Sequence, residues 1–170
     1  MRAWSGRHER LCDRESERDR HELETTDDGE NRRSPATKVR YDVPHGVRSV
    51  VPVIGGDFEG PRLRGKVLPG GGDWLLLRSD GVLELDLRIT LETDDHALIY
   101  MTFQGVRHGL PNVIAALGRG EVVDPAHYYF RTVPRFETSA DAYAFLNRIV
   151  AVGTGEGTPN GAVHTIDEIL

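Results

Sequence analysis

The sequence predicts an all-β protein: an antiparallel, calycin-like β-barrel of about eight strands with one short helix, preceded by a disordered charged N-terminal tail. Three observations predict this fold class. The body of the chain alternates apolar and polar residues with a period of two, as half-buried strands do. Turn residues separate these runs at short intervals, which favours antiparallel neighbours. A helical pattern occurs once, so a barrel or sandwich fits better than an α/β plan.

The N-terminal part differs from the rest of the chain in composition. Among the first forty residues, half are Asp, Glu, Lys or Arg, and few are apolar. Such a stretch cannot offset an ordering entropy of about 1–2 kcal/mol per residue. We therefore divide the chain into a disordered tail, residues 1–38, and a single barrel domain, residues 39–170. The one cysteine, Cys12, lies in the tail, which excludes an internal disulfide.

Charge and hydropathy exclude several classes of partner. The formal net charge is −6 and acids balance bases in the tail, so phosphate is not attracted and no nucleic-acid partner is expected. No apolar run approaches the ~20 residues of a membrane span, so we expect a cytoplasmic protein without membrane contact. The histidines of the body lack the spacing of metal ligands, so no metal and no cofactor is predicted.

The clearest strand is the segment 82–92, in which alternate positions are Leu or Ile. The pair Asp80-Gly81 before it suits a hairpin turn. In chain order, the predicted strands are 47–54, 58–68, 74–78, 82–92, 97–103, 128–132, 145–152 and 162–169. The glycine-rich segments 69–72 and 153–161 are predicted turns.

One short helix is predicted over residues 111–117. Pro111 at its start and Gly118 at its end follow the usual asymmetry of helix termini. Val113, Ile114 and Leu117 share one face. Two turns of helix cannot stand alone, so the helix is expected to cover a barrel opening, as a fixed plug or as a lid gated by substrate.

Four blocks of sequence carry a resemblance to a known family: GGDFEGPRLRG (55–65), LPGGGDW (68–74), YYFRTVPRFET (128–138) and LNR (146–148). They resemble, in order and spacing, the domain of unknown function 3237 family, also called uncharacterised protein family 0311. The resemblance implies a small bacterial barrel of calycin-like appearance, in a family whose members mostly have no assigned activity.

The sequence departs from this family at the first strand. Members usually begin with an apolar strand some twenty residues before the Gly-Gly block, where this chain has the polar stretch 31–38. Residues 39–43 are the expected substitute. Without them the barrel seam would have an unpaired edge.

Polar residues on the predicted strands are the candidate site. Arg131 and Tyr129 share a face of the segment 128–132, and an arginine buried among aromatics needs a carboxylate or an anionic ligand. Asp73, Asp86 and Glu137 are the candidate carboxylates. An internal ion pair that braces the strands and an anion- or enolate-binding site both remain open.

Three function classes follow from these residues. The first is a barrel that binds a small carbonyl or anionic molecule, with Arg131, Tyr129 and Tyr100 as ligand-binding residues. The second is a cofactor-free isomerase, cyclase or lyase, in which Asp86 or Glu137 moves a proton. The third is a non-catalytic assembly module, and a homodimer through an exposed strand edge is compatible with the pattern.

Two further residues, Trp74 and His108, also bear on the candidate site. Trp74 is predicted to anchor the barrel core rather than to stack on a ligand. His108, in a glycine-flanked segment, is the histidine that merits a test for catalysis.

Overall fold

The computed structural model describes residues 20–27 and 39–170 of the chain. Nine strands form one antiparallel sheet within these residues. They are β1 (Arg20–Asp27), β2 (Val39–Val43), β3 (Gly46–Glu59), β4 (Arg64–Arg78), β5 (Leu83–Thr93), β6 (Leu98–Gly109), β7 (Tyr128–Glu137), β8 (Ala151–Thr158) and β9 (Gly161–Glu168). The helical elements are α1 (Pro111–Gly118) and two 3₁₀ helices, η1 (Pro125–His127) and η2 (Asp141–Arg148).

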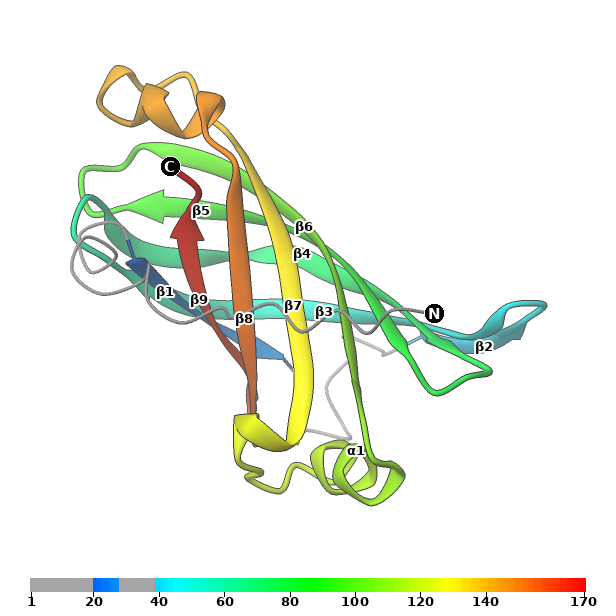
Figure 1. Cartoon of the computed structure of the whole chain (residues 1–170). Helices are drawn as coiled ribbons and strands as arrows, with labels where there is room; N and C mark the ends of the chain where they lie inside the picture. The colour runs from blue at the N-terminus through cyan, green and yellow to red at the C-terminus, as the bar shows by residue number, and fades with distance from the viewer. Residues whose placement is uncertain (1–19, 28–38) are drawn as a thin grey trace, which may run out of the picture.

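The sheet closes into a barrel of eight strands. From β3 to β9 each strand pairs with the next in sequence, and β1 pairs with both β9 and β3. β2 stands outside the ring, because it pairs with the first part of β3 and projects with it from the barrel (Figure 1). The predicted all-β barrel is therefore confirmed.

Strand β1 corrects the expected position of the first barrel strand. Residues 39–43 do not close the seam, and residues 20–27, which composition placed in the tail, do. Leu23 and Thr25 are the buried side chains of this strand, so its apolar pattern is too short to be detected against its charged neighbours. Residues 1–19 and 28–38, with Cys12, lie outside the described residues, and so does the predicted disorder there.

The core lies inside the ring and follows the predicted alternation of β5. Leu85, Leu87, Ile89 and Leu91 point inward, and the paired residues of β6 continue the same layer. The inward residues of β6 include Ile99, Met101 and Phe103, none of which is more than 2% exposed. The apolar face of β5 therefore packs inward, and Glu84 and Thr90 face outward.

The boundaries of β8 also differ from those that the sequence predicted. The predicted strand 145–152 belongs mostly to η2, and the predicted turn 153–161 begins with a strand. The glycines of β8 are explained by packing, because a Cβ on Gly155 would lie 2.6 Å from the ring of Phe130. Large side chains on β7 thus fill the space that side chains on β8 would occupy.

The glycine-rich segment 69–72 also lies within a strand rather than a turn. It forms part of β4, where the register with β5 shifts between Leu68 and Gly72. Four steps along β4 here correspond to two along β5, so odd-numbered residues such as Val67 and Asp73 face inward on both sides of the irregularity.

Helical elements cover the two ends of the barrel (Figure 1). The predicted helix is confirmed as α1, and its side chains Val113, Ile114 and Leu117 pack on the core. At the opposite end η2 contributes Leu146, which is 4% exposed. No helix in the described part of the chain is long and apolar enough to cross a membrane.

Candidate functional site

The predicted site residues lie on the outer face of the barrel. On β7, Tyr129 and Arg131 are exposed and alternate with the buried Tyr128 and Phe130. Asp86 likewise lies on the outer face of β5, with one third of its side chain exposed. The sequence correctly predicted that Tyr129 and Arg131 share a face, but that face is the solvent side.

A groove of about 770 Å³ runs over this outer face. Its volume is in the range of about 300–1,000 Å³ that is typical of small-molecule sites. Three of the predicted residues, Asp86, Tyr129 and Arg131, line it together. Further polar or aromatic side chains at the groove come from three neighbouring strands: Arg48, Trp74 and Glu84.

The other two predicted residues lie elsewhere. Tyr100 and Glu137 face each other across the β6–β7 ladder, both exposed, and neither lines the groove. The structure therefore separates the five predicted residues into three that line the groove and an exposed pair near the η2 end.

Arg131 uses little of its hydrogen-bonding capacity within the protein. Its Nη1 donates to the carbonyl oxygen of Phe130 at 2.8 Å, and its guanidinium carbon lies 5.0 Å from the ring centroid of Tyr129. Asp86, a predicted partner, pairs with Arg88 at 2.8 Å instead. Within the described residues no ion pair joins Arg131 to a carboxylate, and the side chain is exposed at the groove.

Trp74 lies in the groove rather than in the core, so its predicted role as core anchor is wrong. The register places it opposite Val50 on the outer face of β4. Arg48 donates from Nη1 to the carbonyl oxygen of Trp74 at 2.8 Å, and the guanidinium of Arg88 stacks 4.8 Å from the indole. The indole is thus held beside the groove.

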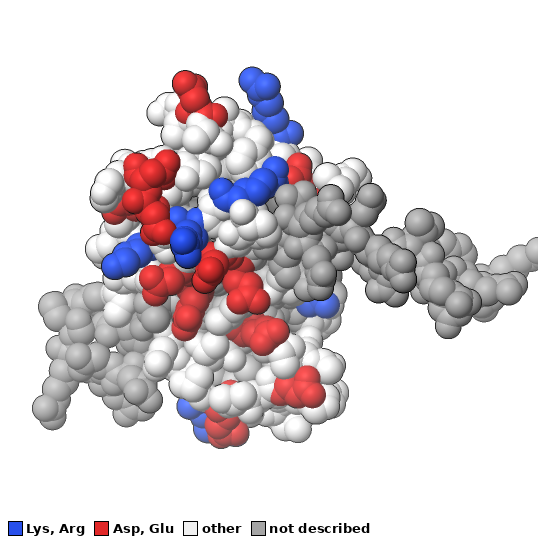
Figure 2. Space-filling model, turned by 90° about the vertical axis from the view of Figure 1, so that its left-hand side faces the viewer, with Lys and Arg blue, Asp and Glu red and all other residues white. Residues whose placement is uncertain are grey.

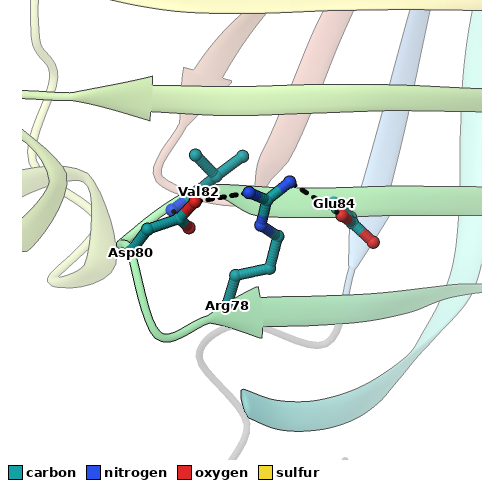
Figure 3. Close-up of polar contacts among 4 residues, drawn as sticks. All are labelled: Arg78, Asp80, Val82 and Glu84. Carbon is teal, nitrogen blue, oxygen red and sulfur yellow. Dashed lines mark hydrogen bonds and ion pairs between the residues drawn. The ribbon is translucent and has the colours of Figure 1, made fainter. Parts of the chain in front are cut away.

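Polar contacts within the β4–β5 turn hold Glu84, a residue that lines the groove (Figure 3). Arg78 binds Asp80 and donates to Glu84 at 3.2 Å, while the N–H of Val82 donates to the Asp80 carboxylate at 3.2 Å. The backbone hydrogen bond from Val82, followed by the contact with Arg78, lowers the pKa of Asp80. Glu84 therefore enters the groove from a rigid hairpin, as the Asp80-Gly81 pair predicted.

His108 adjoins the groove through Tyr129. The two rings are stacked, with centroids 5.0 Å apart and planes inclined by 18°. No group of three or more His, Cys, Asp or Glu residues in the described ranges is arranged to hold a metal ion.

Two ionisable side chains, Asp73 and Arg107, lie on the inner side of the same wall. Asp73 projects inward from β4 and its Oδ1 accepts the backbone N–H of Asp86 at 2.9 Å. Burial raises the pKa of Asp73 to about 7 against the lowering effect of that hydrogen bond; the Asp86 charge raises it further and Arg107 lowers it. Burial lowers the pKa of Arg107, which lies 5.6 Å from the Phe130 ring centroid.

Sequence reasoning named Asp73 as a partner for Arg131 and missed Arg107. The available signal for Arg107 was the alternation of β6, because it follows Ile99, Met101 and Phe103 at even intervals. Buried polar atoms without a hydrogen-bond partner among the described residues include Arg107 Nε, Thr132 Oγ1 and His164 Nδ1.

Fold and site together define a closed antiparallel β-barrel with a polar, aromatic groove on its outer wall. The chain belongs to the family described as Protein of unknown function (DUF3237), whose model matches residues 32–169. The resemblance found in the sequence is thereby confirmed.

Known relatives agree with this assignment. A UPF0311 protein of Rhodopseudomonas palustris is 38% identical over 125 residues, which are 74% of this chain and 82% of the relative. A UPF0311 protein of Clostridium acetobutylicum is 39% identical over 118 residues, 69% of this chain and 75% of that protein.

Solved structures share the barrel. A crystal structure of a conserved protein of unknown function from R. palustris has a TM-score of 0.81 at 30% identity, covering 92% of this chain and 97% of that one. A β-barrel-like protein from Acinetobacter baumannii has a TM-score of 0.70 at 35% identity, covering 87% and 91%. An enzyme from Penicillium herquei, with a TM-score of 0.61 at 19% identity over 94% and 100%, shares the fold alone.

Proposed function

We propose that this protein binds a small organic molecule in the outer groove, with a carbonyl or anionic oxygen of the ligand at Arg131. The observation that carries the proposal is a guanidinium that has no carboxylate partner among the described residues and lies beside an aromatic ring in a groove of ligand size. The sequence favoured the barrel interior as the binding site, but large apolar side chains occupy most of the described core.

Arg131 supplies the polar contact. A guanidinium has five N–H donors in a planar fork, of which the Phe130 carbonyl takes one. The others match a carboxylate or a pair of neighbouring oxygens. Tyr129 and Trp74 offer apolar ring surface for the remainder of the ligand.

The carboxylates of the groove restrict the charge of the ligand. Three carboxylates line the groove together with the cations Arg48 and Arg131: Glu84, Asp86 and Asp167. A dianion such as phosphate would meet repulsion from them, whereas ligand hydroxyl groups could donate to them. The proposed ligand is therefore neutral or singly anionic and carries hydroxyl groups.

The test compares two arginines of one strand. The protein and its Arg131→Gln and Arg135→Gln variants are expressed in the natural host and analysed by native mass spectrometry for a retained metabolite. Arg135 lies on the same outer face of β7 and does not line the groove, so it is the matched control. We expect at least a tenfold loss of ligand occupancy with Arg131→Gln and none with Arg135→Gln. Equal occupancy in all three proteins would refute the proposal.

A second candidate, proton transfer on a carbonyl ligand, is favoured by the position of Asp86 in the same groove as Arg131. In this scheme Arg131 holds the ligand carbonyl oxygen, and the Asp86 carboxylate takes a proton from the adjacent carbon and returns it.

Deuterium exchange distinguishes an enzyme from a binder. With the retained metabolite in D₂O, an enzyme exchanges a proton next to the carbonyl, and Asp86→Asn abolishes exchange while occupancy stays within a few-fold. Exchange no faster than in buffer would exclude this candidate and leave the binding proposal standing.

A further inference from the structure

The barrel end near η2 holds a small apolar cavity that is separate from the groove. Its volume is about 30 Å³. The walls are almost entirely carbon, from side chains on strands all around the ring, among them Leu23, Phe58, Leu91, Met101 and Ala151. Leu146 of η2 covers it, as the buried residue of that helix.

The chemistry of the walls determines what such a space can hold. About 10–15 Å³ is enough for the centre of a water molecule, but a bound water also needs two to four polar partners. His21, Glu22, Arg62 and Glu168 also adjoin the space, but almost all of the surface that faces it is apolar. Apolar cavities of proteins stay dry and take up apolar atoms or molecules. The space is therefore suited to a compact apolar occupant.

Arg62 lies at the rim of this space. Its Nη2 donates to Glu168 Oε2 at 2.6 Å, and its guanidinium carbon lies 4.0 Å from the ring centroid of Phe145. These contacts join the β3–β4 turn to the end of β9 and to η2. Because β1 pairs between β3 and β9, the ion pair spans the seam strand at the edge of the cavity.

The cover is held by few polar contacts. Asn147 exchanges two hydrogen bonds with the backbone of Thr138, at 2.9 and 2.8 Å, and the hydroxyl of Tyr143 donates to Asp95 at 2.8 Å. A 3₁₀ helix has poorer hydrogen-bond geometry than an α-helix. Outward movement of η2 would thus break few bonds while it opens the cavity.

We infer that this cavity is a second binding site, for a compact apolar molecule or the apolar end of a larger one, closed by Arg62 across Glu168 and Phe145. The site is distinct from the groove in both position and chemistry. Its existence does not depend on the proposed function.

Xenon is the probe for the site, in pressurised crystals of the full chain. We expect one xenon atom among Leu91, Met101 and Leu146. Ala151→Val should abolish that peak by filling the cavity, whereas the control Ala162→Val, at an inward position of β9 beside Gly157, should keep it. Absence of xenon in the unchanged protein, or its persistence with Ala151→Val, would overturn the inference.

An enlarged cavity gives a second measurement. Leu146→Ala should bind benzene in a saturable way, with at least tenfold higher affinity than the unchanged protein, and Ala151→Val combined with it should reverse the gain. Benzene affinity that does not respond to Leu146→Ala would count against the site even if Ala151→Val failed to fold.

The role of the rim is tested by exchange rates. Arg62→Gln should speed xenon exchange measured by ¹²⁹Xe NMR at least threefold with little change in affinity. Arg64→Gln is the control, because Arg64 lies on the same turn and pairs with Asp94 at the exposed surface. Equal exchange rates for both variants would overturn the closing role of Arg62.

Discussion

Asp73 and Asp86 are joined by a hydrogen bond of 2.9 Å in which the inward carboxylate accepts the backbone N–H of the outward-facing residue. The bond connects the barrel interior with the wall of the groove. Burial of the Asp73 carboxyl group raises its pKa to about 7, so its charge changes near neutral pH. The protonation of a buried group is thereby coupled to the strand that carries a groove carboxylate.

Replacement of this carboxylate should alter the pH dependence of stability. The pKa of Asp73 is raised from 3.8 to about 7 on folding, so the folded state binds the proton more tightly than the unfolded state. Stability therefore falls as pH rises between these values, by as much as about 1.4 kcal/mol per pH unit. Asp73→Asn should remove that fall, and urea unfolding at several pH values measures it.

We expect Asp73→Asn to have a higher free energy of unfolding than the unchanged protein at pH 8 but not at pH 4. Asp42→Asn is the control, since Asp42 is exposed on β2. A constant difference between Asp73→Asn and the unchanged protein at all pH values would show that Asp73 is not titrating as proposed.

His164 should give a dependence of the opposite sign. It is 2% exposed and lies between the rings of Phe103 and Phe130, at centroid distances of 4.8 and 5.2 Å. Burial lowers its pKa from 6.5 to about 4, so the folded state binds the proton less tightly than the unfolded state. The buried histidine therefore lowers the free energy of unfolding as pH falls through this window. The stability of His164→Leu, compared with that of the unchanged protein, should be higher at pH 5 than at pH 7.5.

His96 provides the contrast for that measurement. It is exposed, and the hydrogen bond to Glu92 raises its pKa. Its small contribution to folding stability is therefore present below the pKa of the unfolded state and lost as pH rises. His96→Gln should therefore lose stability at pH 5 rather than gain it. The same sign for both histidines would contradict the assignment of their environments.

The strands that the sequence predicted best are those with a long, uniform alternation. On β5 the inward positions are leucine or isoleucine and the outward ones polar, so strand and face were both predictable. β7 has aromatic residues on both faces, so the pattern placed Tyr129 and Arg131 together without saying which face is inside. The sequence thus predicted which residues lie together, but it did not predict that they lie on the outer wall of the barrel.

Other features depend on tertiary structure that a local pattern does not contain. Leu23 gives β1 one buried apolar side chain, and the strand exists because β3 and β9 supply partners on both sides. Gly153 and Gly155 signal a turn locally but leave room for β7. The glycine run at 69–72 likewise signals a turn locally, although β4 continues through it to Asp73 and beyond.

The glycines of β8 should be sensitive to small substitutions. A Cβ on Gly155 would approach the Phe130 ring to 2.6 Å, and that ring is buried in the core. We expect Gly155→Ala to lower the free energy of unfolding by about 1–3 kcal/mol, as overpacking of a core does. Gly118→Ala, where no atom lies within 4 Å of the added Cβ, should change it by less than a third as much in chemical denaturation. A similar effect at both glycines would contradict the packing explanation.

The seam between β1 and β3 places like charges opposite each other. Figure 2 shows that acidic side chains form the larger charged group on the side of the barrel that is on the left of Figure 1. In the register of the seam, Glu22 faces Glu59 and Glu24 faces Asp57, all exposed. Directly opposed like charges destabilise a pair of strands.

Glu24→Lys should therefore strengthen the seam. On its other side Glu24 faces Val163, so no cation on a paired strand offsets its charge, and lysine would form a cross-strand pair with Asp57. The gain expected for such a pair is about 0.2–1 kcal/mol, and it should shrink in high salt because the pair is exposed. Glu156→Lys is the matched control, because Glu156 lies on the outer face of β8 opposite the same Val163. Thermal unfolding at low and high salt measures both variants, and equal gains would show that net charge rather than the seam is responsible.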